Sequence, residues 1–110
     1  MKLLVCGTRK KGYEKIVYRE LSAYNFKGSA EIIEGCCPDS ADEYAEKWAK
    51  ETGIKVHHFP GNPGNYLKRN IEMVEMADAV LAFWDDFSYG TAHSIAHAVK
   101  KGIPVKVIHI

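Results

Sequence analysis

The sequence predicts an α/β protein in which residues 1–110 form one three-layer domain, a five-stranded parallel sheet with helices on both faces. Strand-like and helix-like segments alternate along the whole chain, which favours parallel strands joined by right-handed crossovers. The residues from Ala79 to Trp84 are apolar without a break, which is typical of a central strand buried on both faces.

The strands and helices are predicted from apolar periodicity and from the turn residues between them. The predicted strands are Leu3–Cys6, Ala30–Glu34, Ile54–Phe59, Ala79–Trp84 and Val105–Ile110. The predicted helices are Tyr13–Tyr24, a segment that follows Asp39 and stops at Thr52, Tyr66–Ala77 and Thr91–Lys101.

Capping and helix-face assignments follow from the same patterns. Asp39 is predicted as the N-cap of the second helix, with Asp42 reaching back as in a capping box. The inward residues of the last two helices are predicted to be Leu67, Ile71 and Val74, and then Ala92, Ile95, Ala96 and Val99.

The polarity of the strands predicts their order in the sheet. The first and fourth strands are continuously apolar and are therefore central, whereas the third and fifth contain Lys55, His57, Lys106 and His109 and are therefore edges. The resulting order is 3-2-1-4-5, with its switch point between strands one and four. Ligands of such sheets bind at the carboxyl ends of the strands beside that point.

Charge and cysteine content narrow the classes of partner. Fifteen basic and fourteen acidic residues give a formal charge of +1, so broad attraction to nucleic acid or to a membrane is not expected. Three cysteines and no recognisable export signal suggest reduced thiols and a cytoplasmic protein. The small core and the apolar edge strand Val105–Ile110 predict a homodimer.

Two loops should meet at the switch point. Gly7, Thr8 and Arg9 follow the first strand and offer close backbone approach and donors to phosphate, although a plain turn with an exposed arginine is an equal alternative. The turn Ser88-Tyr89-Gly90-Thr91 precedes a helix and suits an anion, although simple helix caps are commoner.

Acidic and amide side chains complete the predicted site. The junction containing Gly35, Cys36, Asp39, Ser40 and Asp42 suits ribose hydroxyls. Asp85 and Asp86 suit the same role, or a hydrated Mg²⁺ beside a phosphorylated ligand. Arg69 and Asn70 either anchor the preceding loop or close the site.

No metal site is predicted. The cysteines lack metal-type spacing, and His93 and His97, although four residues apart on a helix, have no evident third ligand. Cys36 and Cys37 lie near a helix start, where a thiol pKa can be lowered, but free structural thiols are the default.

With these residues placed, nearly the whole chain resembles the SLOG superfamily of Rossmann-like nucleotide-binding domains, which includes the DprA/Smf proteins and the LOG phosphoribohydrolases. The similarity is strongest to its small YspA-like branch of bacteria and phages, which implies the cytoplasm of a bacterium, or of the host cell if the protein is phage-encoded. Gly7-Thr8-Arg9 corresponds to the branch's G-S-R, the stretch from Gly35 to Asp42 to G-G-A-x-G-A-D, and Arg69-Asn70 to R-N. Ala77 to Trp84 and Gly90-Thr91 correspond to A-D-x-V-x-A-F and G-T.

The resemblance implies a nucleotide-type ligand but not a reaction. LOG enzymes use a glutamate where this chain has Ser94, which cannot act as a general acid or base. Binding by a sensor or sequestering domain is therefore the first hypothesis, with no cofactor required. An N-glycosidase using Asp85 or Asp86, with Asp42 as a further substitute, is the alternative. A DprA-like DNA-binding accessory protein is the second, and the near-zero net charge disfavours it.

Overall fold

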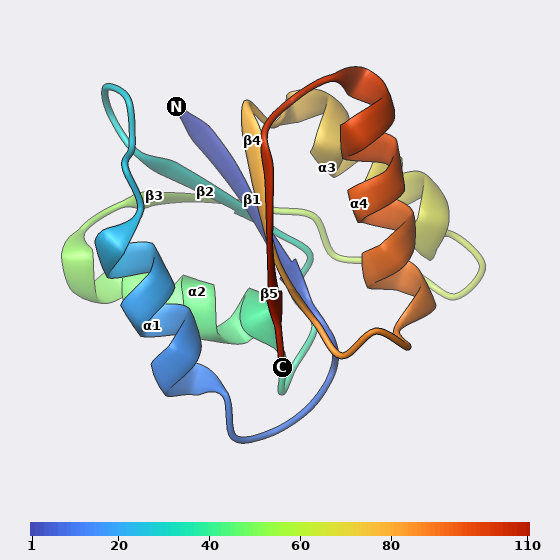
Figure 1. Cartoon of the computed structure of the whole chain (residues 1–110), viewed down its shortest axis with the longest axis horizontal. Helices are drawn as coiled ribbons and strands as arrows, with labels where there is room; N and C mark the ends of the chain where they lie inside the picture. The colour runs from blue at the N-terminus through green and yellow to red at the C-terminus, as the bar shows by residue number, and fades with distance from the viewer.

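The computed structural model describes residues 1–110 and confirms the predicted α/β fold (Figure 1). Its elements are β1 (Lys2–Gly7), α1 (Glu14–Ala23), β2 (Glu31–Glu34), α2 (Ala41–Thr52), β3 (Lys55–His58), α3 (Tyr66–Met76), β4 (Ala79–Trp84), α4 (Tyr89–Lys101) and β5 (Val105–His109). Each lies within a few residues of its predicted bounds.

The sheet is entirely parallel and has the predicted order β3-β2-β1-β4-β5. β1 and β4 pair in the middle, with Leu3 opposite Ala79 and Gly7 opposite Phe83. β3 and β5 are the edges, which places the strands with charged side chains where one side of the ladder is open.

The two faces of the sheet carry separate cores. α1 and α2 cover one face, and α3 and α4 cover the other (Figure 1). Because side chains alternate along a strand, Leu3 and Val5 of β1 pack toward α1 and α2, whereas Leu4 and Cys6 pack toward α3 and α4. No helix is long and apolar enough to cross a membrane.

The predicted inward faces of α3 and α4 are partly wrong. Leu67 and Ile71 are 40% and 37% exposed, and Val99 is 64% exposed, although Val74 is buried as predicted. The buried positions include Arg69 and Asn70 on α3 and Thr91 and Ser94 on α4. Apolar periodicity does not predict Arg69, Thr91 and Ser94 as inward positions, because these polar residues turn inward to line a cleft.

The start of α2 also differs from the prediction. Its N-cap is Ser40, whose hydroxyl accepts a hydrogen bond from the Asp42 amide. Asp39 lies one residue earlier with φ 49°, and Asp42 does not reach back to the cap. Its carboxylate instead accepts from the amides of Gly35 and Cys37, at 3.2 Å each. α4 begins at Tyr89, two residues before its predicted start, and its N-cap is Ser88.

Candidate functional site

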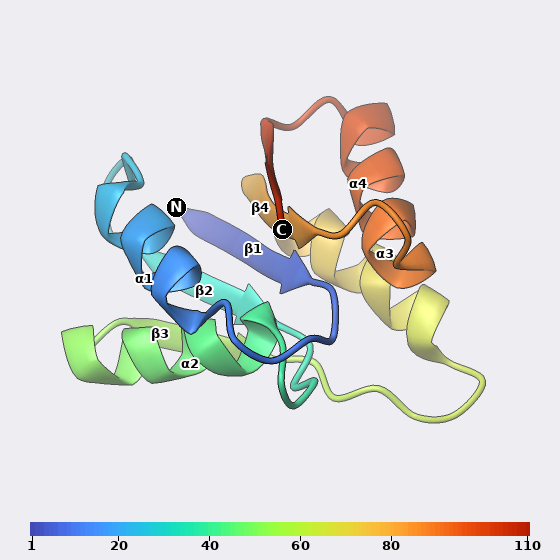
Figure 2. The same ribbon diagram turned by 60° about the horizontal axis from the view of Figure 1, so that its bottom comes forward.

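The loops after β1 and β4 meet at the carboxyl edge of the sheet, which Figure 2 turns toward the viewer. Thr8 Oγ1 donates to Asp85 Oδ1 at 3.0 Å and accepts from the Asp85 amide at 3.1 Å. The Thr8 amide donates to Phe83 O at 2.9 Å. Thr8 is therefore a buried link between the two loops.

A tyrosine connects the same loop to α2. The Tyr13 hydroxyl donates to Thr8 O at 2.6 Å and accepts from the Ala41 amide at 2.7 Å. It also explains Gly7, since a Cβ there would lie 2.9 Å from that hydroxyl and 2.8 Å from Phe83 O. Gly7 is thus required by the packing of the protein itself.

A cleft of about 250 Å³ opens where the end of β1 meets the N-terminal parts of α2, α3 and α4. It is lined by Cys6, Gly7, Arg9, Cys37, Asp42, Arg69, Asn70, Met73, Ser88, Gly90, Thr91 and Ser94. Eight of these twelve are among the predicted ligand-binding residues, so the structure brings most of that set together. The four not named as ligand-binding are Cys6, Cys37, Met73 and Ser94.

Six predicted ligand-binding residues do not line the cleft, namely Thr8, Gly35, Cys36, Asp39, Ser40 and Tyr89. Four of them have evident structural contacts: Thr8 links the loops, Ser40 caps α2, the Asp39 amide donates to Glu43, and Gly35 lies under Arg69. Tyr89 is 71% exposed.

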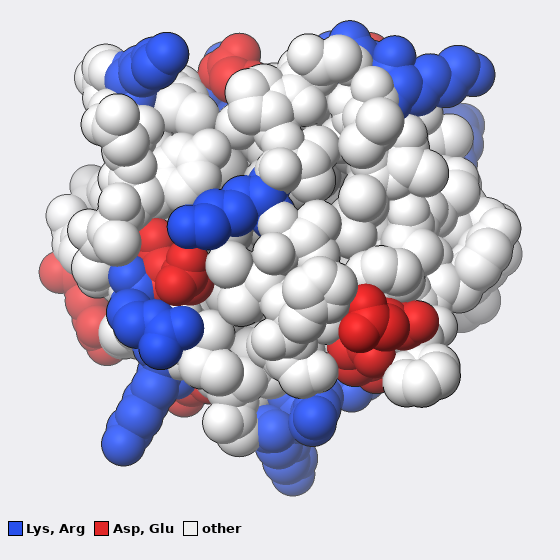
Figure 3. Space-filling view, in the orientation of Figure 1, with Lys and Arg blue, Asp and Glu red and all other residues white.

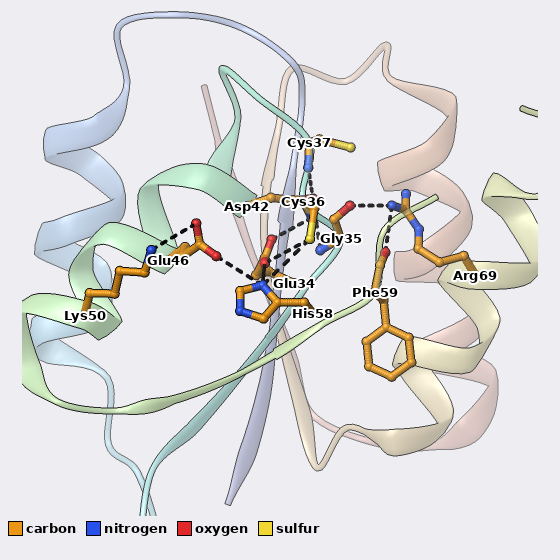
Figure 4. A network of polar contacts seen from close by, with 10 residues as sticks. All are labelled: Glu34, Gly35, Cys36, Cys37, Asp42, Glu46, Lys50, His58, Phe59 and Arg69. Carbon is orange, nitrogen blue, oxygen red and sulfur yellow. Dashed lines mark hydrogen bonds and ion pairs between the residues drawn. The ribbon is translucent and has the colours of Figure 1, made fainter. Parts of the chain in front are cut away.

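Arg69 is held in the wall of the cleft. Its side chain is buried, and Nη1 donates to Gly35 O at 2.6 Å and to Phe59 O at 3.2 Å (Figure 4). Nε donates to Asn70 Oδ1, and Asn70 Nδ2 in turn donates to Gly90 O at 3.4 Å. This chain of contacts joins the ends of β2 and β3 to the start of α4.

Arg9 also lines the cleft, but unlike Arg69 it is free of contacts with other polar groups of the protein. Its side chain is exposed, lines the cleft, and forms no hydrogen bond or ion pair within the protein. An arginine that is not engaged by the fold keeps all five of its N–H donors for a ligand. It is therefore the strongest candidate for contact with an anion.

Asp42 is the one buried carboxylate that lines the cleft. Burial raises its pKa from 3.8 to about 6, although the amide of Cys37 and the charge of Arg69 oppose the shift. A carboxyl group that titrates near neutral pH can donate or accept a proton there. Among the aspartates of the predicted site, Asp42 is thus the best placed for acid–base chemistry.

Asp85 and Asp86, the two predicted catalytic residues, lie outside the cleft. Asp85 Oδ1 accepts from the amides of Phe87 and Ser88 at 2.9 Å, which lowers its pKa and organises the turn before α4. Asp86 is exposed, has φ 70°, and pairs with His109 Nδ1 at 2.9 Å. Both carboxylates therefore support the loop.

Cys36, His93 and His97 also lie outside the cleft. The pKa of Cys36 is raised to about 12 by partial burial and by Glu34, so it is not an activated nucleophile. His97 Nε2 lies 2.8 Å from Glu75 Oε1, whereas the His93 ring lies tilted beside Tyr89 and its buried Nδ1 has no partner.

No family model, curated protein or solved structure matches the chain. The case for function therefore depends on the residues of the cleft.

Proposed function

We propose that this chain binds a phosphorylated, nucleotide-type ligand in the cleft and acts as a sensor or sequestering domain. The observation that carries the proposal is the unengaged Arg9, which shares the cleft with the N-terminal turn of α4. A guanidinium and the free amides of a helix start both favour an anion. The motif resemblance to the SLOG superfamily is consistent with this ligand class, and we include membership of that superfamily in the proposal.

Gly90 supports the same placement of the anion. It lies in the first turn of α4, where glycine is a poorer helix former than alanine. A Cβ at Gly90 would meet no atom closer than Asn70 Nδ2 at 3.8 Å, so the packing of the protein does not require glycine. A glycine that packing does not need is explained by the approach of a ligand to the backbone.

The volume and charge of the cleft limit which part of the ligand it holds. About 250 Å³ is below the range of most drug-sized ligand pockets, so it suits a phosphate and sugar, with the base on the open rim. Phosphate belongs beside Arg9 and Gly90, because the carboxylate of Asp42 repels it. Asp42 suits sugar hydroxyls, and a Mg²⁺ ion accompanying the phosphate is compatible with this arrangement.

The test is calorimetric titration with adenosine 5′-monophosphate, ribose 5-phosphate, adenosine and inorganic phosphate. We expect the phosphorylated sugars to bind and adenosine to bind far more weakly. A ligand at about 100 times its Kd should add about 2.7 kcal/mol to the free energy of unfolding. Equal binding of adenosine and its monophosphate would contradict the proposal.

Two substitutions identify the site. Arg9→Gln should weaken binding, whereas Lys11→Gln, in the same exposed loop but outside the cleft, should not. Gly90→Ala should raise the free energy of unfolding by about 0.5 kcal/mol while weakening the ligand. Unchanged affinity in both cleft variants would place the ligand elsewhere.

A second candidate, hydrolysis of the N-glycosidic bond of a nucleotide, is favoured by the raised pKa of Asp42. Asp42 would protonate the departing base, in place of Asp85 or Asp86. Chromatography of nucleoside monophosphates incubated with the protein should then show free base, and Asp42→Asn should abolish its release while Asp86→Asn does not. An intact nucleotide after long incubation supports binding alone.

DNA binding receives less support. On the face shown in Figure 3, lysine and arginine side chains are separated by uncharged surface and by acidic groups, and they form no continuous basic track. A phosphate backbone is normally bound by such a track.

A further inference from the structure

Three different metal-binding side chains converge beside the cleft, at the carboxyl ends of β2 and β3. Glu34, Cys36 and His58 place one carboxylate oxygen, one sulfur and one ring nitrogen within 4.8 Å of one another (Figure 4). His58 Nδ1 lies 2.7 Å from Glu34 Oε1 and 3.8 Å from Cys36 Sγ. Cys36 Sγ lies 3.4 Å from Glu34 Oε1.

The fold holds these groups together for two separate reasons. Glu34 and His58 are directly opposite each other in the parallel β2–β3 ladder. Cys36 has φ 63°, a left-handed conformation that is unfavourable for a residue with a side chain, and its thiol lies against Glu34. The Cys36 amide donates to Glu34 Oε2 at 2.6 Å and holds the residue beside the carboxylate in this conformation.

The charges around the cluster favour a cation. The Glu34 side chain is 1% exposed and touches no lysine or arginine, and a second carboxylate, Glu46 Oε1, lies 3.1 Å from His58 Nδ1. Lys50 approaches only the other oxygen of Glu46, at 3.9 Å. Two carboxylates thus face one imidazole and one thiol.

We infer that Glu34, Cys36 and His58 form a zinc-binding site, with Glu46 as the nearest group for a fourth position. Thiolate, imidazole and carboxylate are the ligands that zinc accepts together, whereas Mg²⁺ and Ca²⁺ prefer oxygen alone. In binding, the thiol gives up its proton to solvent and Nδ1 offers its lone pair, with the ring proton on Nε2.

The distances are close to those of a tetrahedral site. Zinc bonds of ordinary length separate sulfur from nitrogen or oxygen by about 3.6 Å and nitrogen from oxygen by about 3.4 Å. The sulfur distances of 3.8 and 3.4 Å already match to within a few tenths of an ångström. The 2.7 Å contact between His58 and Glu34 must widen by about 0.7 Å, which a half-exposed imidazole allows.

The site would have a structural consequence for the neighbouring cleft. Zinc at Cys36 fixes the turn between Gly35, which contacts Arg69, and Cys37, which lines the cleft. The ion therefore stiffens one wall of the cleft without entering it.

The test is titration of the reduced full chain with Zn²⁺, and with Co²⁺ as a spectroscopic probe. We expect one ion per chain, a cobalt–thiolate charge-transfer band and the intense visible bands of tetrahedral cobalt. Cys36→Ser and His58→Gln should each weaken zinc by at least about tenfold, and Cys36→Ser should abolish the charge-transfer band. Circular dichroism checks that the variants are folded.

The chain supplies a matched control for each variant. Cys37→Ser removes the adjacent thiol, and His57→Gln removes a histidine that pairs with Glu31 at 2.8 Å. Both should leave the affinity and the cobalt spectrum unchanged. The inference is overturned if zinc does not bind stoichiometrically, if Cys37→Ser weakens it as much as Cys36→Ser, or if cobalt shows no thiolate band.

Discussion

Arg9 and Arg69 show how differently two arginines contribute to one cleft. Arg69 is buried and donates to the carbonyl oxygens of Gly35 and Phe59, so its charge is largely committed to holding β2 and β3. Arg9 has no partner in the protein and is left for a ligand. The sequence predicts both as binding residues, because only the fold distinguishes a supporting guanidinium from a free one.

Gly35 is the position at which this support is most easily disturbed. A Cβ there would lie 2.7 Å from Arg69 Nη1. Gly35→Ala should therefore displace the guanidinium and lower the free energy of unfolding by about 1–3 kcal/mol, as overpacking does elsewhere. Urea unfolding measures the loss, and Gly90→Ala, where a methyl group has room, is the control. Similar effects of the two substitutions would show that Arg69 moves freely.

Asp42 should make stability depend on pH in a defined direction. Because burial raises the pKa of Asp42 in the folded protein, ionisation of this carboxyl group lowers the free energy of unfolding. The destabilisation is absent well below pH 3.8, grows as the pH rises toward about 6, and is constant above that value. The shift corresponds to about 3 kcal/mol. The free energy of unfolding of the native chain, minus that of Asp42→Asn, should fall by about 2 kcal/mol from about pH 4 to about pH 7, because part of the destabilisation is already present at pH 4. Urea unfolding at both values measures it, and a constant difference would mean that Asp42 titrates normally.

At the scale of elements, α3 and α4 depart most from the simple pattern of an amphipathic helix. Near their N-terminal ends their buried residues are polar, Arg69 and Asn70 on one and Thr91 and Ser94 on the other. Apolar periodicity predicts the elements and strand order correctly, since burial sets both. It misassigns these two faces because a cleft needs polar groups on the inside.

The contact among Glu34, Cys36 and His58, the proposed zinc ligands, is a second feature that sequence spacing does not reveal. Cys36 and His58 are 22 residues apart and meet only through the pairing of β2 with β3. The sequence does contain one indication of this contact. Glu34 is an acidic residue at the end of a buried strand, and the next strand also ends in a histidine, His58. To place Glu34 beside His58 one must know the register of β2 against β3, which the pattern of apolar residues does not determine.

The N-cap of α2 gives a prediction for an element boundary. Ser40 is fully buried and its hydroxyl accepts from the Asp42 amide and donates to Cys37 O. Ser40→Ala should lower the free energy of unfolding by about 1–2 kcal/mol. Ser29→Ala, an exposed serine without a side-chain hydrogen bond, should change it little. Thermal or urea unfolding compares them, and an equal, small effect would mean that Ser40 does not cap the helix.

At the scale of the whole molecule, the open edge of β5 and three exposed apolar side chains bear on assembly. Phe87, Tyr89 and Val99 are 88%, 71% and 64% exposed and lie on α4 or just before it. The predicted homodimer therefore has two candidate surfaces, the β5 edge and the exposed side of α4.

Light scattering after size-exclusion chromatography tests the dimer. We expect a dimer at high micromolar concentration, formed through the β5 edge. Val99→Glu should leave it intact, since Val99 lies on α4. If this variant is a monomer, the interface lies on α4 and not at the β5 edge. If the native chain is a monomer, the dimer prediction is wrong.

The central pairing of β1 with β4 also governs when the cleft can form. Thr8 and Asp85 are 77 residues apart, yet their hydrogen bonds join the two loops of the site. Contacts between such distant residues require closure of a long loop and slow the folding of a small domain. During synthesis, the loop that contains Thr8 and Arg9 therefore cannot form its contacts with Asp85 until most of the chain has been made. A ligand that binds the cleft recognises a completed molecule and cannot assist the earlier steps of its folding.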